Sequence, residues 1–287
     1  QDAELEQAIR LIHERGKKAY ITCNVLPREK ELALAPDYFA FLQELGADAL
    51  ILADLGLLRM AERHAPKCAR HVSTQLGVLN SETASFLYEL GADTVVLARE
   101  CSMEEIREIR AHCPPALRIE AFVHGAMCVS FSGRCLLSNY LTGRDSNHGE
   151  CAQPCRWKYH LVEETRPGQY MEISESGGTF ILNAEDLCMI EHLADLRDAG
   201  IDSFKIEGRM KSAYYTGAVT NAYRIALHAL ESGETLPVGA AEECEAVSHR
   251  PYGTGFYYGQ PRQYYPDSLY RSTAEIKAAV VACDENG

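Results

Sequence analysis

A short phrase that joins a helix to a buried strand occurs three times in this chain of 287 residues. Residues 44–48 read Glu-Leu-Gly-Ala-Asp, residues 89–93 repeat the same letters, and residues 199–202 read Ala-Gly-Ile-Asp. Each copy ends an amphipathic stretch at a glycine, which suits the left-handed position that closes a helix. A short apolar run of strand length follows at once. The repetition therefore predicts a chain built from βα units.

Apolar runs of strand length alternate with helical stretches along most of the chain. The predicted strands are residues 19–25, 49–53, 70–73, 94–97, 117–123 and 203–206. The predicted helices are residues 3–15, 36–45, 55–64, 81–90, 103–112, 184–199 and 213–231. Alternation of this kind implies a parallel sheet with right-handed crossovers. Because no glycine-rich phosphate fingerprint follows a strand, a TIM-like (β/α) barrel fits better than a dinucleotide-binding fold.

The number of predicted strands is too small for a closed barrel, which has eight. The chain opens directly on a helix, so we expect a barrel that is incomplete at its N-terminus, with a βα unit missing there. A strand-like run at 272–283 stops abruptly, as in a fragment. The expected organisation is barrel βα units over 1–124, a cysteine-rich insertion over 125–180, closing barrel units over 181–235, and a tyrosine-rich segment with the start of a C-terminal β domain over 236–287.

Composition excludes several classes of protein. The chain carries 28 basic and 41 acidic residues, a formal charge of −13, which argues against indiscriminate nucleic-acid binding but allows a local basic patch for RNA. No apolar run reaches the roughly 18 residues that a membrane span needs. Residues 1–10 have neither the basic nor the apolar region of a signal peptide. We expect a cytoplasmic protein that does not cross a membrane.

The eleven cysteines are unevenly distributed. Six are scattered and fit small buried hydrophobes, namely Cys23, Cys68, Cys101, Cys113, Cys244 and Cys283. Four others, Cys128, Cys135, Cys151 and Cys155, fall within one short segment. Because disulfides are rare in reducing compartments, this segment suggests metal or redox chemistry, although four packing cysteines are the plain alternative.

Spacing favours a cluster over zinc in this segment. Structural zinc sites usually bring their ligands as close pairs, and the gap of six residues between Cys128 and Cys135 departs from that pattern. Four converging thiolates also suit an iron–sulfur cluster. Cys188 lies beside the core stripe of a predicted helix, where packing is the commoner role, and it is the reserve ligand.

The same segment resembles a known family. The pattern Glu120-x-Phe122-x-x-Gly125-Ala126-Met127-Cys128-x4-Gly133-x-Cys135-x-Leu137-Ser138 is similar at every defined position to the signature of the collagenase-like peptidase U-32 family. Residues 144–151, 155–157 and 205–212 resemble further family blocks. The similarity runs through nearly the whole chain.

The resemblance implies two kinds of activity. The family was named for collagen degradation, while other members take part in forming 5-hydroxyuridine in tRNA, in hydroxylating cytidine in ribosomal RNA, and in oxygen-independent ubiquinone synthesis. Some members hold a [4Fe–4S] cluster, and some RNA-directed ones depend on prephenate. By position, Cys128, Cys135 and Cys151 match the cluster cysteines, and Cys155 is the expected fourth.

The residues themselves favour redox chemistry over hydrolysis. The sequence has neither a Gly-x-Ser-x-Gly elbow nor a His-Glu-x-x-His helix. A Cys–His pair could join Cys128 or Cys135 to His124, but four clustered thiols fit a single nucleophile poorly. We expect iron–sulfur-dependent hydroxylation of an RNA base, tRNA uridine first. The alternatives are a collagenase-like peptidase, ubiquinone-precursor hydroxylation, and a non-catalytic RNA-binding or partner protein.

Four residues at predicted strand ends are the catalytic candidates, namely Glu120, His124, Glu207 and Arg209. His124 could tune the cluster or move protons, or be a hydrogen-bonded loop histidine. Glu120 could equally be a paired structural carboxylate. Arg209 could clamp a carboxylate or phosphate, or pair with Glu207. His71 and Gln75 bracket another strand end as weaker candidates.

A local reversal of charge marks the expected RNA surface. Residues 134–160 carry four basic and two acidic residues together with Trp157 and Tyr159, which suits phosphate binding and base stacking, although a solvated loop has similar composition. The expected substrate-binding residues are Arg134, Arg144, Arg156, Trp157 and Lys211. Six C-terminal tyrosines could stack bases or pack on the barrel, namely Tyr252, Tyr257, Tyr258, Tyr264, Tyr265 and Tyr270. A paired subunit of the same family is a further expected partner.

Overall fold

The computed structural model of the protein describes residues 2–157, 159, 161–162, 170–171, 183–264 and 270–274. Tyr265, Cys283 and most of the strand-like run at 272–283 lie outside the described residues, as does much of the second half of the insertion. Within the described part, no helix is both long enough and apolar enough to cross a membrane.

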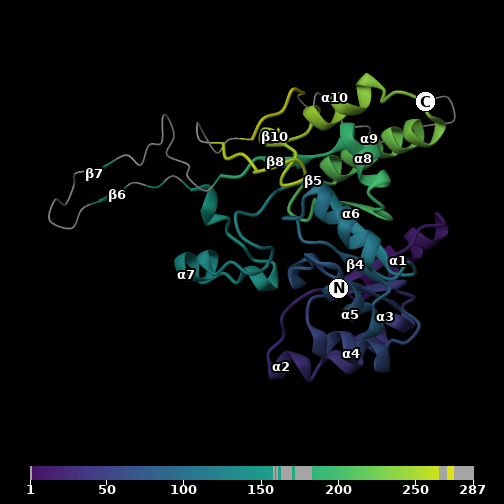
Figure 1. The fold of residues 1–287 in the computed structure, drawn as a ribbon. Helices are drawn as coiled ribbons and strands as arrows, with labels where there is room; N and C mark the ends of the chain where they lie inside the picture. The colour runs from purple at the N-terminus through teal and green to yellow at the C-terminus, as the bar shows by residue number, and fades with distance from the viewer. Residues whose placement is uncertain are drawn as a thin grey trace, which may run out of the picture.

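A mostly parallel sheet lies at the centre of the fold, with helices packed around it (Figure 1). The strands are β1 (Tyr20–Cys23), β2 (Ala49–Leu52), β3 (Ala69–Val72), β4 (Thr94–Val96), β5 (Arg118–Gly125), β6 (Leu161–Val162), β7 (Tyr170–Met171), β8 (Asp186–Cys188), β9 (Ser203–Ile206) and β10 (Tyr252–Gly253). The α-helices are α1 (Asp2–Glu14), α2 (Glu29–Leu32), α3 (Ala35–Glu44), α4 (Leu55–His64), α5 (Ser81–Glu89), α6 (Met103–His112), α7 (Leu137–Thr142), α8 (Leu193–Asp198), α9 (Ala213–Ser232) and α10 (Val238–Ala246). Short 3-10 helices are η1 (Thr74–Leu76), η2 (Ser146–His148), η3 (Pro154–Arg156) and η4 (Ile190–His192).

The strand order follows the chain over most of the sheet. Strands β1 to β5 pair in sequence and in parallel, and β9 pairs in parallel with β5. The last residues of β5 also pair with β8, which runs antiparallel to it, and β8 pairs in parallel with β10. Strands β6 and β7 form a separate antiparallel pair. The six strands from β1 to β9 thus have the neighbour order of a TIM barrel, and in the described residues no ladder joins β1 to β9.

The three repeated phrases form the same helix end. Gly46, Gly91 and Gly200 have φ angles of 88°, 89° and 88°, so each lies in the left-handed region that favours glycine. In each copy the residue after the glycine donates a backbone hydrogen bond to a carbonyl five residues earlier, as Ala92 does to Leu87 at 2.9 Å. This is the bond that closes a helix before a turn. The predicted helix stops are confirmed.

The aspartate that follows each glycine by two residues joins neighbouring strands. Its backbone N–H donates to the carbonyl at the start of the adjacent strand, and its carboxylate accepts the N–H of that same residue. The three pairs are Asp48 with Ala19 at 2.9 and 2.7 Å, Asp93 with Arg70 at 2.9 and 2.8 Å, and Asp202 with Ile119 at 2.8 and 2.8 Å. Each reciprocal pair fixes where two parallel strands begin relative to each other, and therefore sets their register.

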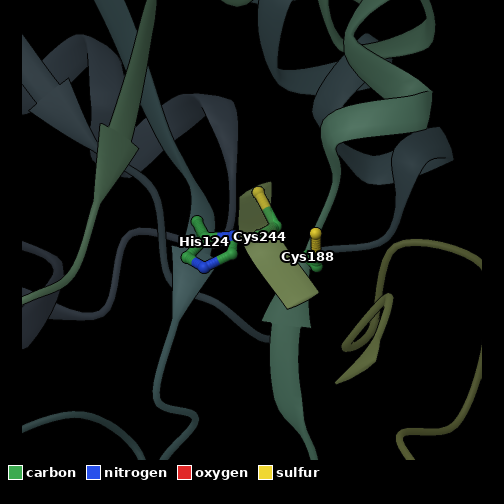
Figure 2. Close-up of side chains that lie close together, drawn as sticks. All are labelled: His124, Cys188 and Cys244. Carbon is green, nitrogen blue, oxygen red and sulfur yellow. The ribbon is translucent and has the colours of Figure 1, made fainter. Parts of the chain in front are cut away.

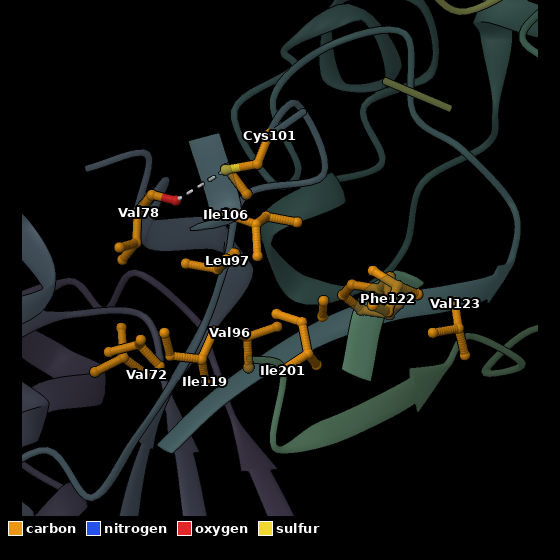
Figure 3. Packing of buried hydrophobic residues seen from close by; sticks show 14 of the residues in the cluster. Val72, Val78, Val96, Leu97, Cys101, Ile106, Ile119, Phe122, Val123 and Ile201 are labelled. Atoms are coloured by element: carbon orange, nitrogen blue, oxygen red, sulfur yellow. Dashed lines mark hydrogen bonds between the residues drawn. The ribbon is translucent and has the colours of Figure 1, made fainter. Parts of the chain in front are cut away.

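The main core lies between the sheet and its helices. Val72, Val96 and Ile119 from three neighbouring strands are buried against each other and against helical side chains such as Ile106 (Figure 3). Cys101 is one of the scattered cysteines, and its thiol donates to the carbonyl oxygen of Val78 at 3.8 Å inside this cluster. It is buried, which agrees with the packing role expected for the scattered cysteines.

One predicted helix is wrong in its first half. Residues 184–199 were expected to form a single helix, whereas Asp186–Cys188 form β8 and the helix α8 begins at Leu193. The strand is stabilised by an ion pair between the buried carboxylate of Asp186 and the guanidinium of Arg250. Because this partner is distant in the sequence, the local pattern does not reveal the strand. With β8 and β10 added, the sheet has eight strands instead of the six expected.

The role of the strand-start aspartates can be tested by unfolding. We expect Asp93→Ala to lower the free energy of unfolding by about 1–2 kcal/mol, because Arg70 loses the charged acceptor of its backbone N–H. Asp93→Asn should cost less, since its amide oxygen can still accept. Urea unfolding of the full chain measures both, with the exposed Asp198→Ala as control at about 0.5 kcal/mol or less. If Asp93→Ala and Asp198→Ala lost equal free energy of unfolding, the role of Asp93 in joining neighbouring strands would be contradicted.

Candidate metal centre

The cysteine segment that follows β5 is held against the carboxyl ends of the first strands. Arg134 Nε donates to the carbonyl oxygen of Gln75, which follows β3, at 3.2 Å. The side-chain amide of Asn147 accepts from the backbone N–H of Leu26 at 2.9 Å and donates to the carbonyl of Leu26 at 3.2 Å. These bonds bring the insertion over the same end of the sheet at which barrel enzymes carry their chemistry.

The ends of β5 and β9 approach each other closely. Gly125 has a φ of 113°, and a Cβ atom at this position would lie 2.5 Å from the carbonyl oxygen of Glu207. The backbone N–H of Glu207 donates to the carbonyl of His124 at 2.9 Å. Only glycine fits between these two backbones. The segment after β9 therefore lies beside the cysteine segment after β5.

The four cysteines of the insertion line one cavity of about 450 Å³. Cys128, Cys135 and Cys155 are partly buried, and Cys151 is exposed. The cavity is also lined by four charged side chains, namely Arg99, Arg156, Glu207 and Lys211. We call this space the four-cysteine cavity. The sequence predicts from their spacing that these four cysteines belong together, and in the structure all four line this cavity.

Backbone amides approach two of the four sulfur atoms. The N–H of Leu137 donates to Cys135 Sγ at 3.4 Å and that of Gln153 donates to Cys151 Sγ at 3.4 Å. In each case the donor is two residues after the cysteine. Amide donors stabilise the thiolate form, in which cysteine binds a metal.

Two buried guanidinium groups face the same cavity. Arg99 stacks on the ring of Phe122 with its Cζ 3.9 Å from the ring centre, and its Nη1 donates to Ala126. Within the described residues, Arg99 Nε and Arg156 Nη1 are buried and have no hydrogen-bond partner. Buried donors without partners are rare in folded proteins. Both residues also line the four-cysteine cavity, so each brings a positive charge to its wall.

The same guanidinium groups act on the thiols. Burial raises the pKa of Cys128, and the charge of Arg99 opposes that rise. Burial likewise raises the pKa of Cys155, and Arg156 opposes it. Neighbouring cysteines contribute to both effects, which places the sulfur atoms within electrostatic reach of one another.

The predicted catalytic residues lie in different environments. Glu207 lines the four-cysteine cavity and accepts from the backbone N–H of Arg209 at 3.0 Å, while the exposed guanidinium of Arg209 lies over Gly149. Glu120 is buried away from the cavity, where it pairs with Lys205 Nζ at 2.7 Å. Its second oxygen accepts from Ser203 at 2.8 Å. The paired state that was the alternative for Glu120 is the one observed.

The weaker candidates His71 and Gln75 contact different partners. His71 is buried and meets the ring of Tyr20 edge-on at 4.7 Å, and burial lowers its pKa. Gln75 accepts from the side-chain amide of Asn24. Neither side chain is among the cavity lining.

Of the predicted substrate-binding residues, Arg156 and Lys211 line the cavity, and Arg134, Arg144 and Trp157 are not in its lining. Lys211 Nζ is 4.2 Å from the ring centre of Tyr270 and donates to the carbonyl of Ser248 at 2.8 Å. Trp157 is 42% exposed, and Arg144 is also exposed. The sequence analysis missed Tyr140, which is 82% exposed on α7, and α7 extends to the side away from α1 and α3 in Figure 1.

The C-terminal tyrosines divide by exposure. Tyr257 is buried and donates to the carbonyl of Phe122 at 2.5 Å, so it packs against β5. Tyr258 and Tyr270 are 50% and 48% exposed. Tyr264 donates its backbone N–H to Asn183 at 2.8 Å.

A second group of sulfur ligands lies inside the fold. His124 on β5, Cys188 on β8 and Cys244 on α10 lie side by side (Figure 2), and their ligand atoms are all within 4.8 Å of one another. His124 and Cys244 are each only 1% exposed. We call these residues the buried trio. Cys188, the reserve ligand, and His124, a catalytic candidate, thus meet each other and not the four-cysteine cavity.

The buried trio perturbs its own thiols in opposite directions. The thiol of Cys244 and the imidazole of His124, both close to Cys188, lower the pKa of Cys188 against the effect of burial. The nearby thiol of Cys188, together with burial, raises the pKa of Cys244. Nothing in the sequence pattern pointed to Cys244, because it is far from the other cysteines of either group.

Comparison with known proteins identifies a family whose members resemble this chain. The model of peptidase family U32 matches residues 1–265. The chain is 36% identical to tRNA hydroxylation protein P of Escherichia coli (strain K12), over 88% of this chain and 64% of that protein. It is 36% identical to the 23S rRNA 5-hydroxycytidine synthase of the same organism, over 79% of this chain and 33% of that protein. It is 32% identical to a collagenase of Porphyromonas gingivalis (strain ATCC BAA-308 / W83), over 90% of this chain and 63% of that protein.

The matched regions cover most of this chain but a smaller share of its relatives. The chain spans less than two thirds of the length of each of these three proteins. The family signature of residues 120–138 lies at the end of β5 and the start of α7, where it supplies two of the four sulfur atoms of the cavity. With a family match over more than nine tenths of its residues, the chain belongs to peptidase family U32.

Proposed function

We propose that this protein hydroxylates an RNA base, tRNA uridine first, with an iron–sulfur cluster held by Cys128, Cys135, Cys151 and Cys155. The observation that carries the proposal is the four-cysteine cavity, whose lining contains four cysteines together with the guanidinium groups of Arg99 and Arg156. Relatives named for tRNA hydroxylation and for 5-hydroxycytidine synthesis support RNA as the substrate class.

The sulfur atoms of the cavity do not converge closely enough for a single tetrahedral ion. Zinc–sulfur bonds of about 2.3 Å place the four sulfurs of a tetrahedral zinc site about 3.8 Å apart. Among the described residues, the buried trio is the group whose ligand atoms come within 4.8 Å of one another, and no three of the four cavity cysteines do so. Thiolates that each bind a different corner of a cubane cluster lie farther apart than ligands of one ion.

The donor set fits an anionic cluster. A [4Fe–4S] cluster bound by four thiolates has a negative total charge, and it supplies one-electron chemistry when bound. Arg99 and Arg156 line the cavity and would compensate such a charge inside the protein. The amides that follow Cys135 and Cys151 donate to the sulfurs themselves.

The remaining cavity residues suit an anionic co-substrate. Lys211 lines the cavity together with Arg99, and its Nζ is fixed by Ser248 and by the ring of Tyr270. A carboxylate beside these cations gains charge-assisted hydrogen bonds. Prephenate, which the family resemblance suggested, has two carboxylates and is the co-substrate that we propose. Glu207 also lines the cavity, where it can accept a proton from a bound hydroxyl group.

The surface next to the cavity suits single-stranded RNA. Trp157 and Tyr140 are exposed rings on which bases can stack, and Arg144 is an exposed cation of the same segment. This segment is locally basic although the whole chain has a charge of −13. RNA loops are recognised by stacking and phosphate contacts of this kind.

A peptidase is less well supported by the geometry. The Cys–His pair considered from the sequence would join Cys128 or Cys135 to His124. His124 is not part of the cavity lining and contacts Cys188 and Tyr223 instead. Four cysteines that line one cavity remain unexplained by a hydrolytic mechanism that needs one nucleophile.

Metal analysis tests the cluster. Anaerobically purified full-length protein should contain about four iron and four sulfide per chain, as the cluster requires. Cys135→Ser should lose most of both because it removes one corner ligand, while Cys113→Ser, a buried cysteine outside the cavity, should retain them. Iron and sulfide that are absent from the wild type, or unchanged in Cys135→Ser, would refute the cluster.

Nucleoside mass spectrometry tests the reaction. Expression of the protein in an Escherichia coli strain that lacks tRNA hydroxylation protein P should restore hydroxylated uridine in tRNA, and Cys135→Ser should not. If tRNA stays unmodified and the purified protein cleaves gelatin with Cys135→Ser fully active, the protein is a peptidase and the proposal fails.

Salt-dependent binding tests the RNA surface. Trp157→Ala should weaken binding of an unmodified tRNA anticodon stem-loop by about tenfold, the effect of one lost stacking contact. Arg144→Gln should lower the slope of log affinity against log salt by about 1. Arg63→Gln, an exposed arginine at the end of α4, serves as control and should change neither quantity. If Arg63→Gln weakened RNA binding as much as Trp157→Ala, the RNA would bind to a surface other than the one proposed.

A further inference from the structure

The buried trio is a separate group of metal-ligating side chains that the proposed function does not use. Its members come from three elements far apart in the chain, namely β5, β8 and α10. A chance meeting of one histidine and two cysteines in a protein interior leaves three polar groups to be satisfied away from water. Imidazole and thiolate are the donors that zinc prefers.

The positions of the donor atoms are close to those of a zinc site. One nitrogen and two sulfurs of a tetrahedral site lie about 3.5 to 3.8 Å apart. The three donor atoms of the trio lie within 4.8 Å of one another, so an approach of about 1 Å brings them to bonding positions. Figure 2 shows the three side chains close together in the space between β5, β8 and α10.

The surroundings of His124 are those of a ligating imidazole. Its Nδ1 lies 3.3 Å from the hydroxyl of Tyr223, and its Nε2 lies 3.3 Å from the hydroxyl of Tyr252. Both hydroxyls donate their own protons elsewhere, Tyr223 to the carbonyl of Val123 at 2.7 Å and Tyr252 to that of Cys244 at 2.9 Å. Whichever nitrogen binds a metal, the other can donate to a phenol oxygen, which fixes the ring as in known metal sites.

A cavity adjoins the two sulfurs. Its volume is about 260 Å³, and Cys188, Cys244 and Tyr252 are in its lining together with Glu191 and Glu245. Three protein ligands beside an open space are typical of zinc sites that keep an exchangeable fourth ligand. The trio therefore differs from a closed structural site with four protein ligands.

We propose that His124, Cys188 and Cys244 bind one zinc ion whose fourth ligand is water or a small molecule from the adjoining cavity. The ion joins β5, β8 and α10, and so fastens the antiparallel strand β8 to the parallel part of the sheet. This site is independent of the four-cysteine cavity, because none of its ligands lines that cavity.

Cobalt substitution tests the site without interference from the cavity. The background is full-length protein with Cys128→Ser and Cys135→Ser, treated with a chelator and checked by circular dichroism for its fold. We expect it to bind about one equivalent of Co²⁺ with sulfur-to-metal charge-transfer absorption and the strong visible bands of a tetrahedral ion, and Zn²⁺ should displace it. Azide should shift the visible bands by replacing the fourth ligand.

Matched variants assign the ligands. Cys244→Ser in the same background should weaken Co²⁺ binding at least tenfold and reduce the charge-transfer band, while Cys113→Ser should change neither. Zn²⁺ should raise the unfolding midpoint of the background protein and leave that of the Cys244→Ser protein unchanged, a readout that holds even where absorption is weak.

Several results would overturn the site. The first is a background protein that binds no Co²⁺ at one equivalent, and the second is a Cys244→Ser variant with the spectrum and affinity of its parent. The third is a set of Co²⁺ bands that azide leaves unchanged, because the ion would then have no open fourth position. Loss of iron and sulfide from Cys188→Ser in otherwise native protein would place Cys188 on the cluster and also overturn the zinc site.

Discussion

A reciprocal pair of hydrogen bonds at the start of neighbouring strands sets the geometry of this protein. Asp202 donates its backbone N–H to Ile119 and accepts the N–H of the same residue through its carboxylate, and so fixes β9 against β5. A slip of one residue would turn every side chain of β9 to the other face. With the register fixed, Glu207 meets Gly125, and the segments that follow the two strands form the wall of one cavity.

The mostly parallel α/β arrangement could be predicted because its signals are local. Six of the seven predicted helices and all six predicted strands are present, since glycine stops and apolar runs are written in short stretches of sequence. The grouping of Cys128, Cys135, Cys151 and Cys155 was also predictable, because these cysteines lie within one insertion. Their assignment as cluster ligands remains a prediction that the structure accommodates.

The parts that were missed depend on partners distant in sequence. Strand β8 is too short to have a period of its own, and it forms because Asp186 meets Arg250 and because His124 and Gly125 offer a ladder. Cys244 could not be linked to Cys188 because 55 residues separate them. Glu120 was assigned a catalytic role from its strand end, and its partner Lys205 is only seen once β5 and β9 are aligned.

Strand β5 connects the two groups of sulfur ligands. His124 belongs to the buried trio, and Cys128, four residues later, lines the four-cysteine cavity.

The two groups of sulfur ligands differ in how much of their geometry exists before a ligand binds. In the trio, packing and phenol hydroxyls already hold a buried histidine. In the cavity, Cys151 is exposed and the other sulfurs are only partly buried, so the occupant itself must order more of its ligands. Because ordering side chains costs conformational entropy, binding in the cavity depends more strongly on how many sulfurs engage at once. Removal of a single cavity cysteine therefore affects the remaining ligands as well, whereas the trio keeps most of its arrangement through the fold.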